Sequence, residues 1–384
     1  MPVLSSLRSP RVRLPRAALL CSGCLLLLLA LSGCQTIGYY SQAISGQYEI
    51  LVSEMPIRNL VADPATPPKL KLKLEQALKL LEFASHELHL PAEGNYRKYV
   101  DLHRPYVVWN VNVAPALSLR PKTWWFPVVG SASYRGYFKE EAAQNYGRLW
   151  EKKGWDVYID GVQAYSTLGW FHDPLLNTYI YESEASLADL IFHELAHQRL
   201  YVAGDTDFNE AFAMTVAGAG VRRWFEASHD TNSYQSYQRN LAHERDFVDL
   251  IMAARGQLEA VYANPNLTGA VKLQRKTELV QELRRNYAKL KDRWGSPAPG
   301  YDAWFSEPIN NAKLNTISAY YDLKPAFESL LAAQGGDLEK FYHAAKDLAK
   351  LPAAQRHETL RAYLKSHQQG VGALDPSVVI LRKP

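Results

Sequence analysis

Residues 189–198 of the chain read Asp189-Leu190-Ile191-Phe192-His193-Glu194-Leu195-Ala196-His197-Gln198. The segment contains the pattern His-Glu-x-x-His, and its apolar spacing predicts a helix. At about 3.6 residues per turn, His193 and His197 lie on one face and one turn apart, so both imidazoles can reach a single ion. Glu194 is then placed to polarise a water molecule held by that ion. The segment therefore predicts a metal site.

A helix with surface histidines is the alternative interpretation of this pattern. Leu187, Ile191 and Leu195 make the segment apolar enough to be buried. Burying two imidazoles and a carboxylate is costly unless a partner such as a metal ion compensates them. We therefore favour the metal site over a surface helix.

A tetrahedral catalytic zinc needs a third protein ligand. The extended metzincin pattern is excluded, because Leu200 and Ala203 stand where its glycine and histidine should be. Gly204-Asp205 is typical of a helix stop, and a second helix is predicted to open at Thr206 with Glu210 in its first turn. A glutamate that a second helix presents to the zinc resembles the arrangement of the gluzincins.

Glu210 also has a structural interpretation. Asp207-x-x-Glu210 matches a capping box, in which the glutamate would serve the helix terminus instead of a metal. Asp205 and Asp207 are alternative ligands, since some zinc peptidases use an aspartate. We favour Glu210 because the residues after it are small enough for close helix packing. These small residues are Ala211, Ala213, Ala217, Gly218, Ala219 and Gly220.

The N-terminus has the features of a secretion signal. An apolar stretch from Ala17 to Leu31 follows a basic one, whose charges are Arg8, Arg11, Arg13 and Arg16. Leu31-Ser32-Gly33-Cys34 resembles the lipobox of bacterial lipoproteins, in which the chain is cleaved before a cysteine that carries diacylglycerol. An ordinary signal peptide or a short membrane anchor is the alternative. Since Gln35 is not the aspartate that usually retains lipoproteins in the inner membrane, the resemblance implies lipidation of Cys34 and an outer-membrane location facing the periplasm.

The composition outside this segment argues against nucleic-acid binding. Four of the 43 basic residues and none of the 39 acidic ones precede Cys34, so 39 basic and 39 acidic residues remain. The apparent basicity thus belongs to the secretion signal. All three cysteines lie in or at the end of the signal, so the rest of the chain forms no disulfide and depends on an apolar core.

The remaining chain alternates between extended and helical patterns in its first half. Leucine spacing predicts a helix over Lys69–Leu88, and a further helix is predicted over Lys139–Lys153. Extended segments are predicted at Tyr106–Val113, Trp124–Gly130, Trp155–Ile159 and Asn177–Tyr181.

The second half is predicted to be helical throughout. Ser233–Tyr262 and Ala270–Trp294 are long, charged and periodic, and the Asn264-Pro265-Asn266 turn between them predicts an antiparallel hairpin. Further helices are predicted at Pro308–Tyr321, Ala326–Gln334, Leu338–Lys350 and Ala353–Lys365.

These patterns predict an α+β fold. We expect a zincin-like metallopeptidase domain with a small mixed sheet, the His-Glu-x-x-His helix and the Glu210 helix, followed by a largely helical C-terminal part. In such domains an edge strand lies beside the cleft and pairs with the substrate backbone. The expected divisions are a signal peptide at 1–33, a helical segment at 34–102, a catalytic core at 103–228 and a helical region at 229–384 that completes the cleft.

Several strings together resemble the family of predicted zinc aminopeptidases found as bacterial lipoproteins. They span nearly the whole chain after the signal. They are Phe126-Pro127-Val128-Val129-Gly130, Tyr134-Arg135-Gly136-Tyr137-Phe138, Ala164-Tyr165-Ser166-Thr167-Leu168-Gly169-Trp170-Phe171 with Asp173-Pro174-Leu175, His193-Glu194-Leu195-Ala196-His197-Gln198, Asn209-Glu210-Ala211-Phe212-Ala213 and Asn310-Asn311-Ala312-Lys313-Leu314.

The resemblance implies one zinc ion per chain, held by His193, His197 and Glu210. Glu194 is implied as the general base that takes the proton of the attacking water and passes it to the leaving amine. The oxyanion of the intermediate needs a donor, for which Tyr320 is the leading candidate. Other candidates for this donor are Tyr321, Tyr165 and His172.

Substrate binding adds three weaker candidates. An aminopeptidase recognises a free α-amino group, normally with a carboxylate, and Asp173 is our candidate. Arg135 is a candidate for binding a peptide carbonyl or C-terminus, although a structural salt bridge is the alternative. Tyr165 completes the predicted substrate-binding residues.

Three functions follow from this sequence. The first is a zinc aminopeptidase that trims peptides in the periplasm. The second is a periplasmic zinc endopeptidase in outer-membrane protein quality control, which cleavage inside N-terminally blocked peptides would reveal. The third is a non-catalytic binding module with the same fold, which the presence of Glu194 and all three expected ligands makes least favoured.

Overall fold

The computed structural model describes residues 36–126, 130–164, 172–295, 300–321 and 323–371, without the side chains of 318–321 and 365–371. Helices and small sheets combine in an α+β fold, as predicted. The chain divides into two compact units, Met1–Leu51 and Val52–Pro384. The described residues of the first unit are helical. All labelled elements belong to the second unit, and the four predicted divisions of the chain stay a prediction.

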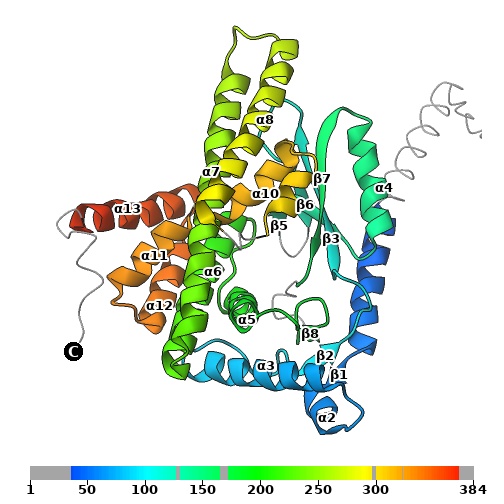
Figure 1. Ribbon diagram of the computed structural model, residues 1–384, viewed down its shortest axis with the longest axis vertical. Coiled ribbons are helices and arrows are strands. Elements are labelled where there is room, and N and C mark those ends of the chain that lie inside the picture. Colours follow the sequence, from blue (N-terminus) through cyan, green and yellow to red (C-terminus); the bar gives the residue numbers. More distant parts are fainter. Residues whose placement is uncertain (1–35, 127–129, 165–171, 296–299, 322, 372–384) are drawn as a thin grey trace, which may run out of the picture. The chain divides into compact units, whose positions relative to one another are not determined.

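The strands form three small sheets (Figure 1). The order is β1-β2-β8 in the first, β6-β3-β7 in the second and β4-β5 in the third. In the second sheet both neighbours run antiparallel to β3, which leaves β6 and β7 as edges. The strands are β1 Met55–Pro56, β2 Lys98–Val100, β3 Val108–Pro115, β4 Trp124–Phe126, β5 Gly130–Ala132, β6 Tyr134–Tyr137, β7 Trp155–Val162 and β8 Leu175–Leu176.

Helices make up most of the second unit. Those in its first half are α2 Ile57–Ala62, α3 Pro68–His86, α4 Glu140–Glu151, α5 Glu184–Arg199 and α6 Thr206–Ser228. Those in its second half are α7 Thr231–Ala263, α8 Gly269–Trp294, α9 Asp302–Ser306, α10 Asn311–Tyr321, α11 Lys324–Ala333, α12 Leu338–Ala349 and α13 Ala353–Val371. None of the helices in the described ranges combines the length and the apolar composition needed to cross a membrane.

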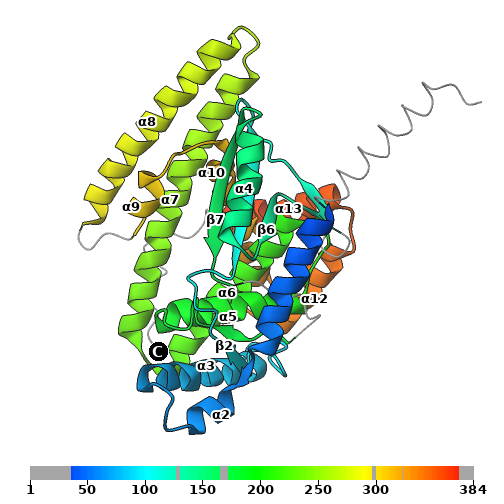
Figure 2. The ribbon, with the colours of Figure 1, turned by 90° about the vertical axis from the view of Figure 1, so that its right-hand side faces the viewer.

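The predicted helical hairpin is confirmed. α7 and α8 lie side by side, and the turn between them contains Pro265, as expected. Figure 2 shows the pair extending beyond the sheet. Aromatic and aliphatic side chains such as Phe247, Ile251 and Leu283 are buried between these helices and α9.

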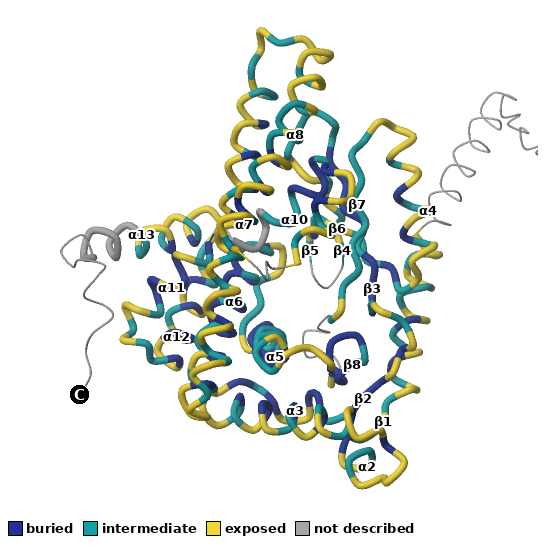
Figure 3. Tube along the Cα trace, in the orientation of Figure 1, coloured by how far each residue is buried: buried dark blue, intermediate teal, exposed yellow. Residues whose placement is uncertain are grey.

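The His-Glu-x-x-His segment lies on a buried helix, also as predicted. Ser183 caps the N-terminus of α5, because its hydroxyl accepts a hydrogen bond from the N–H of Ser186 at 3.1 Å. No residue between Leu187 and Gln198 is exposed (Figure 3). α3 and α6 pack against α5. The apolar spacing of α5 therefore serves burial on several sides at once, which suits a helix in the core.

The connection between α5 and α6 is held by two side chains. Asn209 accepts a hydrogen bond from the N–H of Val202 and donates one to its carbonyl, both at 2.8 Å. Asp205 caps α6 by accepting from the N–H of Phe208 at 3.2 Å. The capping-box alternative is therefore wrong: Asp205 is the cap, and Glu210 is the fifth residue of α6 rather than part of its first turn.

Asp205 also joins the connection to α13. Its carboxylate forms a buried ion pair with Arg356 and lies 2.9 Å from Nε2 of His357. A buried carboxylate with these partners is fully compensated by the protein itself. This pairing argues against Asp205 as a metal ligand.

Close packing of α5 and α6 is confirmed at one of the predicted small residues. A Cβ atom at Gly220 would lie 2.7 Å from Cδ1 of Leu88 and from Cδ2 of Phe192. Phe192 precedes His193 on α5, so this contact holds α6 close to α5 at a point ten residues after Glu210. Only a residue without a side chain fits here.

The extended segment predicted at Asn177–Tyr181 is wrong. The strand there is β8, which ends at Leu176, and the N–H groups of Tyr179 and Ile180 fold back onto the carbonyl of Leu176. Of the aromatic and β-branched residues that suggested a strand, Thr178, Tyr179 and Ile180 are buried in a turn before α5, whereas Tyr181 is exposed. Burial on all sides produces the same composition as a strand, which is why the pattern misled.

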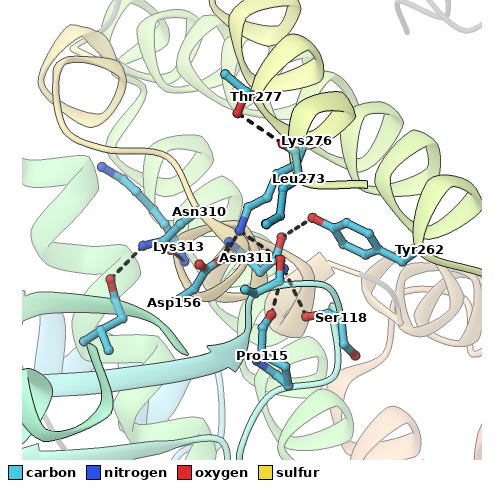
Figure 4. A network of polar contacts seen from close by, with 12 residues as sticks. Pro115, Ser118, Asp156, Tyr262, Leu273, Lys276, Thr277, Asn310, Asn311 and Lys313 are labelled. Carbon is cyan, nitrogen blue, oxygen red and sulfur yellow. Dashed lines mark hydrogen bonds and ion pairs between the residues drawn. The ribbon is translucent and has the colours of Figure 1, made fainter. Parts of the chain in front are cut away.

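The Asn310-Asn311-Ala312-Lys313-Leu314 string joins α10 to the sheet (Figure 4). The Asn311 amide donates to the carbonyls of Pro115 and Ser118 at 2.9 and 3.2 Å. Its N–H donates to Asp156 of β7 at 2.8 Å, and Lys276 of α8 forms an ion pair with the same carboxylate. This network fixes α10 against the β6-β3-β7 sheet. Helix α4 also packs on this sheet.

Candidate metal centre

Three side chains from two helices meet at one point. His193 and His197 extend from consecutive turns of α5, and Glu210 extends from α6. The Nε2 atoms of the two histidines are 3.1 Å apart. Oε2 of Glu210 is 3.2 Å from Nε2 of His193, and Oε1 is 3.6 Å from Nε2 of His197. In the described part of the chain, these residues form a group whose candidate ligand atoms all lie within 4.8 Å of one another.

The donor set and its spacing fit a zinc ion. Tetrahedral zinc with bonds of about 2.0–2.1 Å separates its ligand atoms by roughly 3.3–3.4 Å. The three observed distances are close to this value. Nδ1 of His197 is buried and has no hydrogen-bond partner among the described residues, so Nε2 alone orients this ring. Two imidazoles and one carboxylate are also the ligand chemistry that zinc enzymes use.

The protonation states of Glu210 and His193 depend on each other. Burial lowers the pKa of His193, but the hydrogen bond and the charge of Glu210 outweigh burial and raise this pKa to about 9. Burial raises the pKa of Glu210, whereas hydrogen bonds from both histidines hold it well below its usual range. Both shifts favour an ionised carboxylate beside a protonated imidazole when no metal ion is bound.

Glu194 lies beside this group on α5 and is half-buried. Burial raises its pKa, the two histidines lower it, and the carboxylates of Glu210 and Asp173 raise it again, so the net pKa is raised. Asp173 is itself buried. The structure therefore brings Asp173 into the surroundings of Glu194. A carboxylate with a raised pKa can accept a proton more readily than an ordinary one.

Tyr96 also lies near Glu194, and sequence reasoning missed it. Its side chain is buried, and its hydroxyl has no hydrogen-bond partner among the described residues. Burial, and then the charge of Glu194, raises the pKa of this hydroxyl, which stays protonated. The backbone has a φ of 56°, which is uncommon for tyrosine. Strain together with an unsatisfied buried hydroxyl makes Tyr96 a candidate for a functional role, and no local sequence signal predicted it.

Asp189 supports His193 from one turn earlier on α5. Its charge is among the groups that raise the pKa of His193, and Tyr237 of α7 donates to its carboxylate at 3.2 Å. Carboxylates beside metal-binding histidines orient the ring and increase its basicity. The four-residue spacing to His193 was a signal in the sequence that could have indicated this role.

Tyr134, on the edge strand β6, is a further residue near the three candidate ligands. It is partly exposed, yet desolvation of its hydroxyl, and then the carboxylates of Glu210 and Glu194, raise its pKa. The hydroxyl is therefore a hydrogen-bond donor close to both carboxylates. The predicted edge strand beside the site is present in β6, but Tyr134 was not among the residues predicted from it.

Arg135 lies on the opposite face of the same strand. Successive side chains of a strand point to opposite faces, and the guanidinium of Arg135 lies 4.6 Å from the ring centroid of Tyr146 on α4. It also lies 5.7 Å from the ring of Tyr137. Packing against these rings gives Arg135 a structural role, and its position does not support the predicted role in substrate binding.

The structure does not place the other predicted residues at the candidate site. Cys34 and Tyr165 lie outside the described residues, as do the side chains of Tyr320 and Tyr321. His172 is exposed, and its ring packs over Gly94, where a Cβ atom would lie 2.7 Å from Cε1 of the imidazole. Nothing places His172 beside the candidate ligands.

Comparison with known proteins gives one match. A family model described as "Putative aminopeptidase" matches residues 38–360. No curated protein and no solved structure matches the chain. The matched range includes the candidate ligands, Glu194, Tyr96 and Tyr134.

Proposed function

The chain belongs to the family described as "Putative aminopeptidase", and on that premise we propose that it is a zinc-dependent aminopeptidase with a zincin-like fold of the gluzincin type. The observation that carries the proposal is the meeting of His193, His197 and Glu210 within 4.8 Å, with Glu194 beside them. These residues would hold the zinc ion. When bound, zinc supplies a Lewis acid for the attacking water and for the scissile carbonyl.

Glu194 moves the proton in this proposal. Its carboxylate takes a proton from the attacking water and delivers it to the nitrogen of the leaving amine. Burial and neighbouring carboxylates raise its pKa, which brings its basicity closer to that needed for both transfers. Asp189 acts through His193, because it orients that ring and does not touch the substrate.

Tyr134 donates to the oxyanion. The tetrahedral intermediate carries a negative charge that a positioned donor stabilises. The hydroxyl of Tyr134 stays protonated because its pKa is raised, and it lies near both Glu210 and Glu194. Tyr134 is our candidate for this role, and Tyr320, whose side chain lies outside the described residues, stays a prediction. Tyr96 is buried near Glu194, and its hydroxyl is available to donate a hydrogen bond within the site.

Asp173 binds the free α-amino group. Its carboxylate is buried and close enough to Glu194 to raise the pKa of that residue. A carboxylate near the general base is where the ammonium of a substrate would lie when its first peptide bond is cleaved. Preference for free N-termini over blocked ones would support this assignment.

The function is tested by Glu194→Gln. The variant should keep its fold and bind zinc as the unchanged protein does, while peptide hydrolysis falls by about 10²- to 10⁴-fold, because the proton acceptor is lost. Zinc content is measured by metal analysis and turnover with a panel of free and N-acetylated peptides. Unchanged turnover would overturn the role of Glu194. Efficient cleavage inside acetylated peptides would favour the endopeptidase, and no cleavage of any peptide would favour the binding module.

A membrane attachment through Cys34 belongs to the same proposal. The lipobox-like Leu31-Ser32-Gly33-Cys34 precedes a helical segment whose apolar side chains are exposed. Ile37, Ile44 and Tyr48 are 65 to 70% exposed in it. Exposed apolar side chains next to a lipidated cysteine are suited to the surface of a bilayer. We place the protein on the periplasmic face of the bacterial outer membrane.

A further inference from the structure

A cavity of about 650 Å³ lies next to the α5–α6 connection. Its wall includes Tyr134 and residues 204–207 of that connection, but not the candidate ligands themselves. The β6-β3-β7 sheet contributes Asn110, Asn112 and Asp160, and helices α7 and α10 contribute Arg255 and Asn315. Its size falls within the range of pockets that bind small ligands or side chains.

Asp160 lies on β7 and faces this cavity. Asn110 of β3 is its direct partner in the register. Asn112 lies two residues further on the same face of β3, and its side-chain amide donates a hydrogen bond to the carboxylate of Asp160. Burial raises the pKa of Asp160 to about 7, although the bond from Asn112 lowers it, and the distant charge of Glu307 adds to the rise. None of the groups that set this pKa is a cation.

The other charges on the cavity wall have partners elsewhere. Asp205 is paired with Arg356 and His357, and Asp207 also has an interaction partner. Arg255 donates to the side-chain oxygen of Asn315 at 2.5 Å; burial lowers the pKa of its guanidinium, and the charge of Glu259 raises it. In the described part of the chain, no ion pair joins any of these groups to Asp160.

A desolvated carboxylate without a cation is costly for the folded protein. Burial of an unpaired charge costs free energy, and aspartate is also a poor residue for the middle of a strand. Asp156 on the same face of β7 shows the compensated alternative, because Lys276 pairs with it. Protonation relieves part of this cost near pH 7, and a ligand that brings a positive charge would relieve it while the carboxylate stays ionised.

We propose that this cavity binds a basic side chain of the peptide substrate, with Asp160 as its counter-ion. The ammonium or guanidinium group pairs with Asp160, and the side-chain oxygens of Asn110 and Asn112 are available as further acceptors. Tyr134 lines the cavity, and the charges of Glu210 and Glu194 act on its hydroxyl, so a lysine or arginine next to the scissile bond can extend along it. This inference rests on the proposed peptidase function and adds its substrate class.

The test compares matched peptides that differ in one charge. Lysine is replaced by norleucine, and arginine by citrulline, in peptides that otherwise have the same sequence. The unchanged protein should favour the charged member in KM by roughly 10- to 100-fold, the range expected for a hydrogen-bonded charge pair. Asp160→Asn should remove this preference, and Asp160→Glu should restore part of it. Because the ratio is internal to each protein, a partly unfolded variant does not distort it.

Asp156→Asn is the matched control. It removes a carboxylate from the same strand and face, but one that already has Lys276 as its cation. It should lower stability while the preference for the charged peptide is kept. A preference that survives in Asp160→Asn, or that is absent from the unchanged protein, would overturn the proposal.

Binding measurements keep this inference separate from the proposed function. Calorimetry on Glu194→Gln protein records the affinity for lysine and norleucine peptides without any turnover. A lysine preference that disappears with Asp160→Asn supports the cavity even if no peptide is hydrolysed. Peptides with a free and with an acetylated N-terminus supply the second comparison. Asp160→Asn could instead lower the affinity for every peptide with a free α-amino group, whatever its side chain. That result would contradict the proposal and show that Asp160 binds the N-terminus of the substrate.

Discussion

The pKa values of single residues at the candidate metal centre are set by the charges of their neighbours. Glu210 is held ionised by two imidazoles, and His193 is held protonated by Glu210. These two shifts oppose burial, which would otherwise neutralise both groups. A metal ion bound here would replace the proton that His193 carries, so binding and protonation are linked at this residue.

Zinc binding should therefore release a proton. The pKa of His193 in the metal-free site is about 9, and a ligand imidazole must be neutral. Near pH 7 the uptake of zinc should release about one proton from this ring, and the affinity should rise by about tenfold per pH unit up to about pH 9. Calorimetry in buffers of different ionisation enthalpy measures the release. Glu210→Gln removes the group that raises the pKa, so the release should shrink.

The same shift sets the stability of the metal-free protein. The folded pKa of His193 is raised above its ordinary value of about 6.5, so its contribution is complete below pH 6.5 and is lost as the pH rises through about 9. Thermal unfolding with a chelator should therefore show a falling Tm from about pH 6.5 to pH 9. A Tm that rises over this range would contradict the assigned direction.

Glu210→Ala is the sharpest single substitution for the ligand set. Asp205 caps α6, so Glu210 has no capping role whose loss would explain an effect. The affinity for zinc should fall by more than about 100-fold, since even supporting residues behind metal ligands cost roughly 10- to 100-fold. Competition with a coloured chelator measures it. Asp207→Ala, three residues earlier on the same helix, should leave the affinity nearly unchanged, and equal losses in both variants would contradict the assignment.

At the scale of elements, two helices and their connection create the site. α5 supplies two candidate ligands through its own periodicity, whereas α6 supplies the third only because Asn209 and Asp205 fix the connection. The distance between the helices is set at Gly220, which faces Phe192. The placement of Glu210 is thus a property of the helix pair rather than of α6 alone.

Gly220→Ala should separate the two helices. The added Cβ would lie 2.7 Å from atoms of Leu88 and Phe192, and overpacking of this kind costs about 1–3 kcal/mol. The affinity for zinc should fall as well, because Phe192 precedes His193. Gly218→Ala is the control on the same helix, since its Cβ would meet only the Tyr237 hydroxyl at 3.9 Å. That variant should be neutral or more stable by up to about 1 kcal/mol. Urea unfolding with and without zinc distinguishes the two.

On the scale of the whole molecule, regions far apart in sequence form the walls of one site. The sheet supplies Tyr134 and Asp160, α10 closes one face through the Asn311 network, and α13 reaches the α5–α6 connection through Arg356. The helical region after residue 229 therefore contributes residues to the cavity, and its completion of a catalytic cleft stays a prediction. The lipid anchor proposed at Cys34 would act on the whole molecule by placing it on a membrane.

Lipidation of Cys34 predicts firm membrane attachment. Two acyl chains bind a bilayer far more strongly than one, and the chain after the signal has equal numbers of acidic and basic residues, so charge does not explain such attachment. Mass spectrometry of the N-terminal peptide should show a diacylglyceryl cysteine as the first residue. An unmodified N-terminus at another residue would contradict this and leave the peptidase proposal untouched. Cys34→Ser is the control, since it leaves no thiol to modify.

The sequence by itself determined the features that depend on neighbours along the chain. The α5 helix, its Ser183 cap, the spacing of His193 and His197 and the α7–α8 hairpin all follow from helical periodicity and local hydrogen bonds. Such interactions join residues a few positions apart, and their geometry is therefore written in the local pattern. The α+β class followed for the same reason.

Only the tertiary structure decided which distant residues meet. The pairing of Asp205 with Arg356 joins residues about 150 positions apart, and the nearness of Tyr134 to Glu210 depends on how β6 is placed against α6. Asp160 became a candidate because the sheet register sets it on the wall of a cavity where no described residue forms an ion pair with its carboxylate. Burial, desolvation and charge pairing depend on all residues that are neighbours in space, and a local sequence pattern does not specify those neighbours.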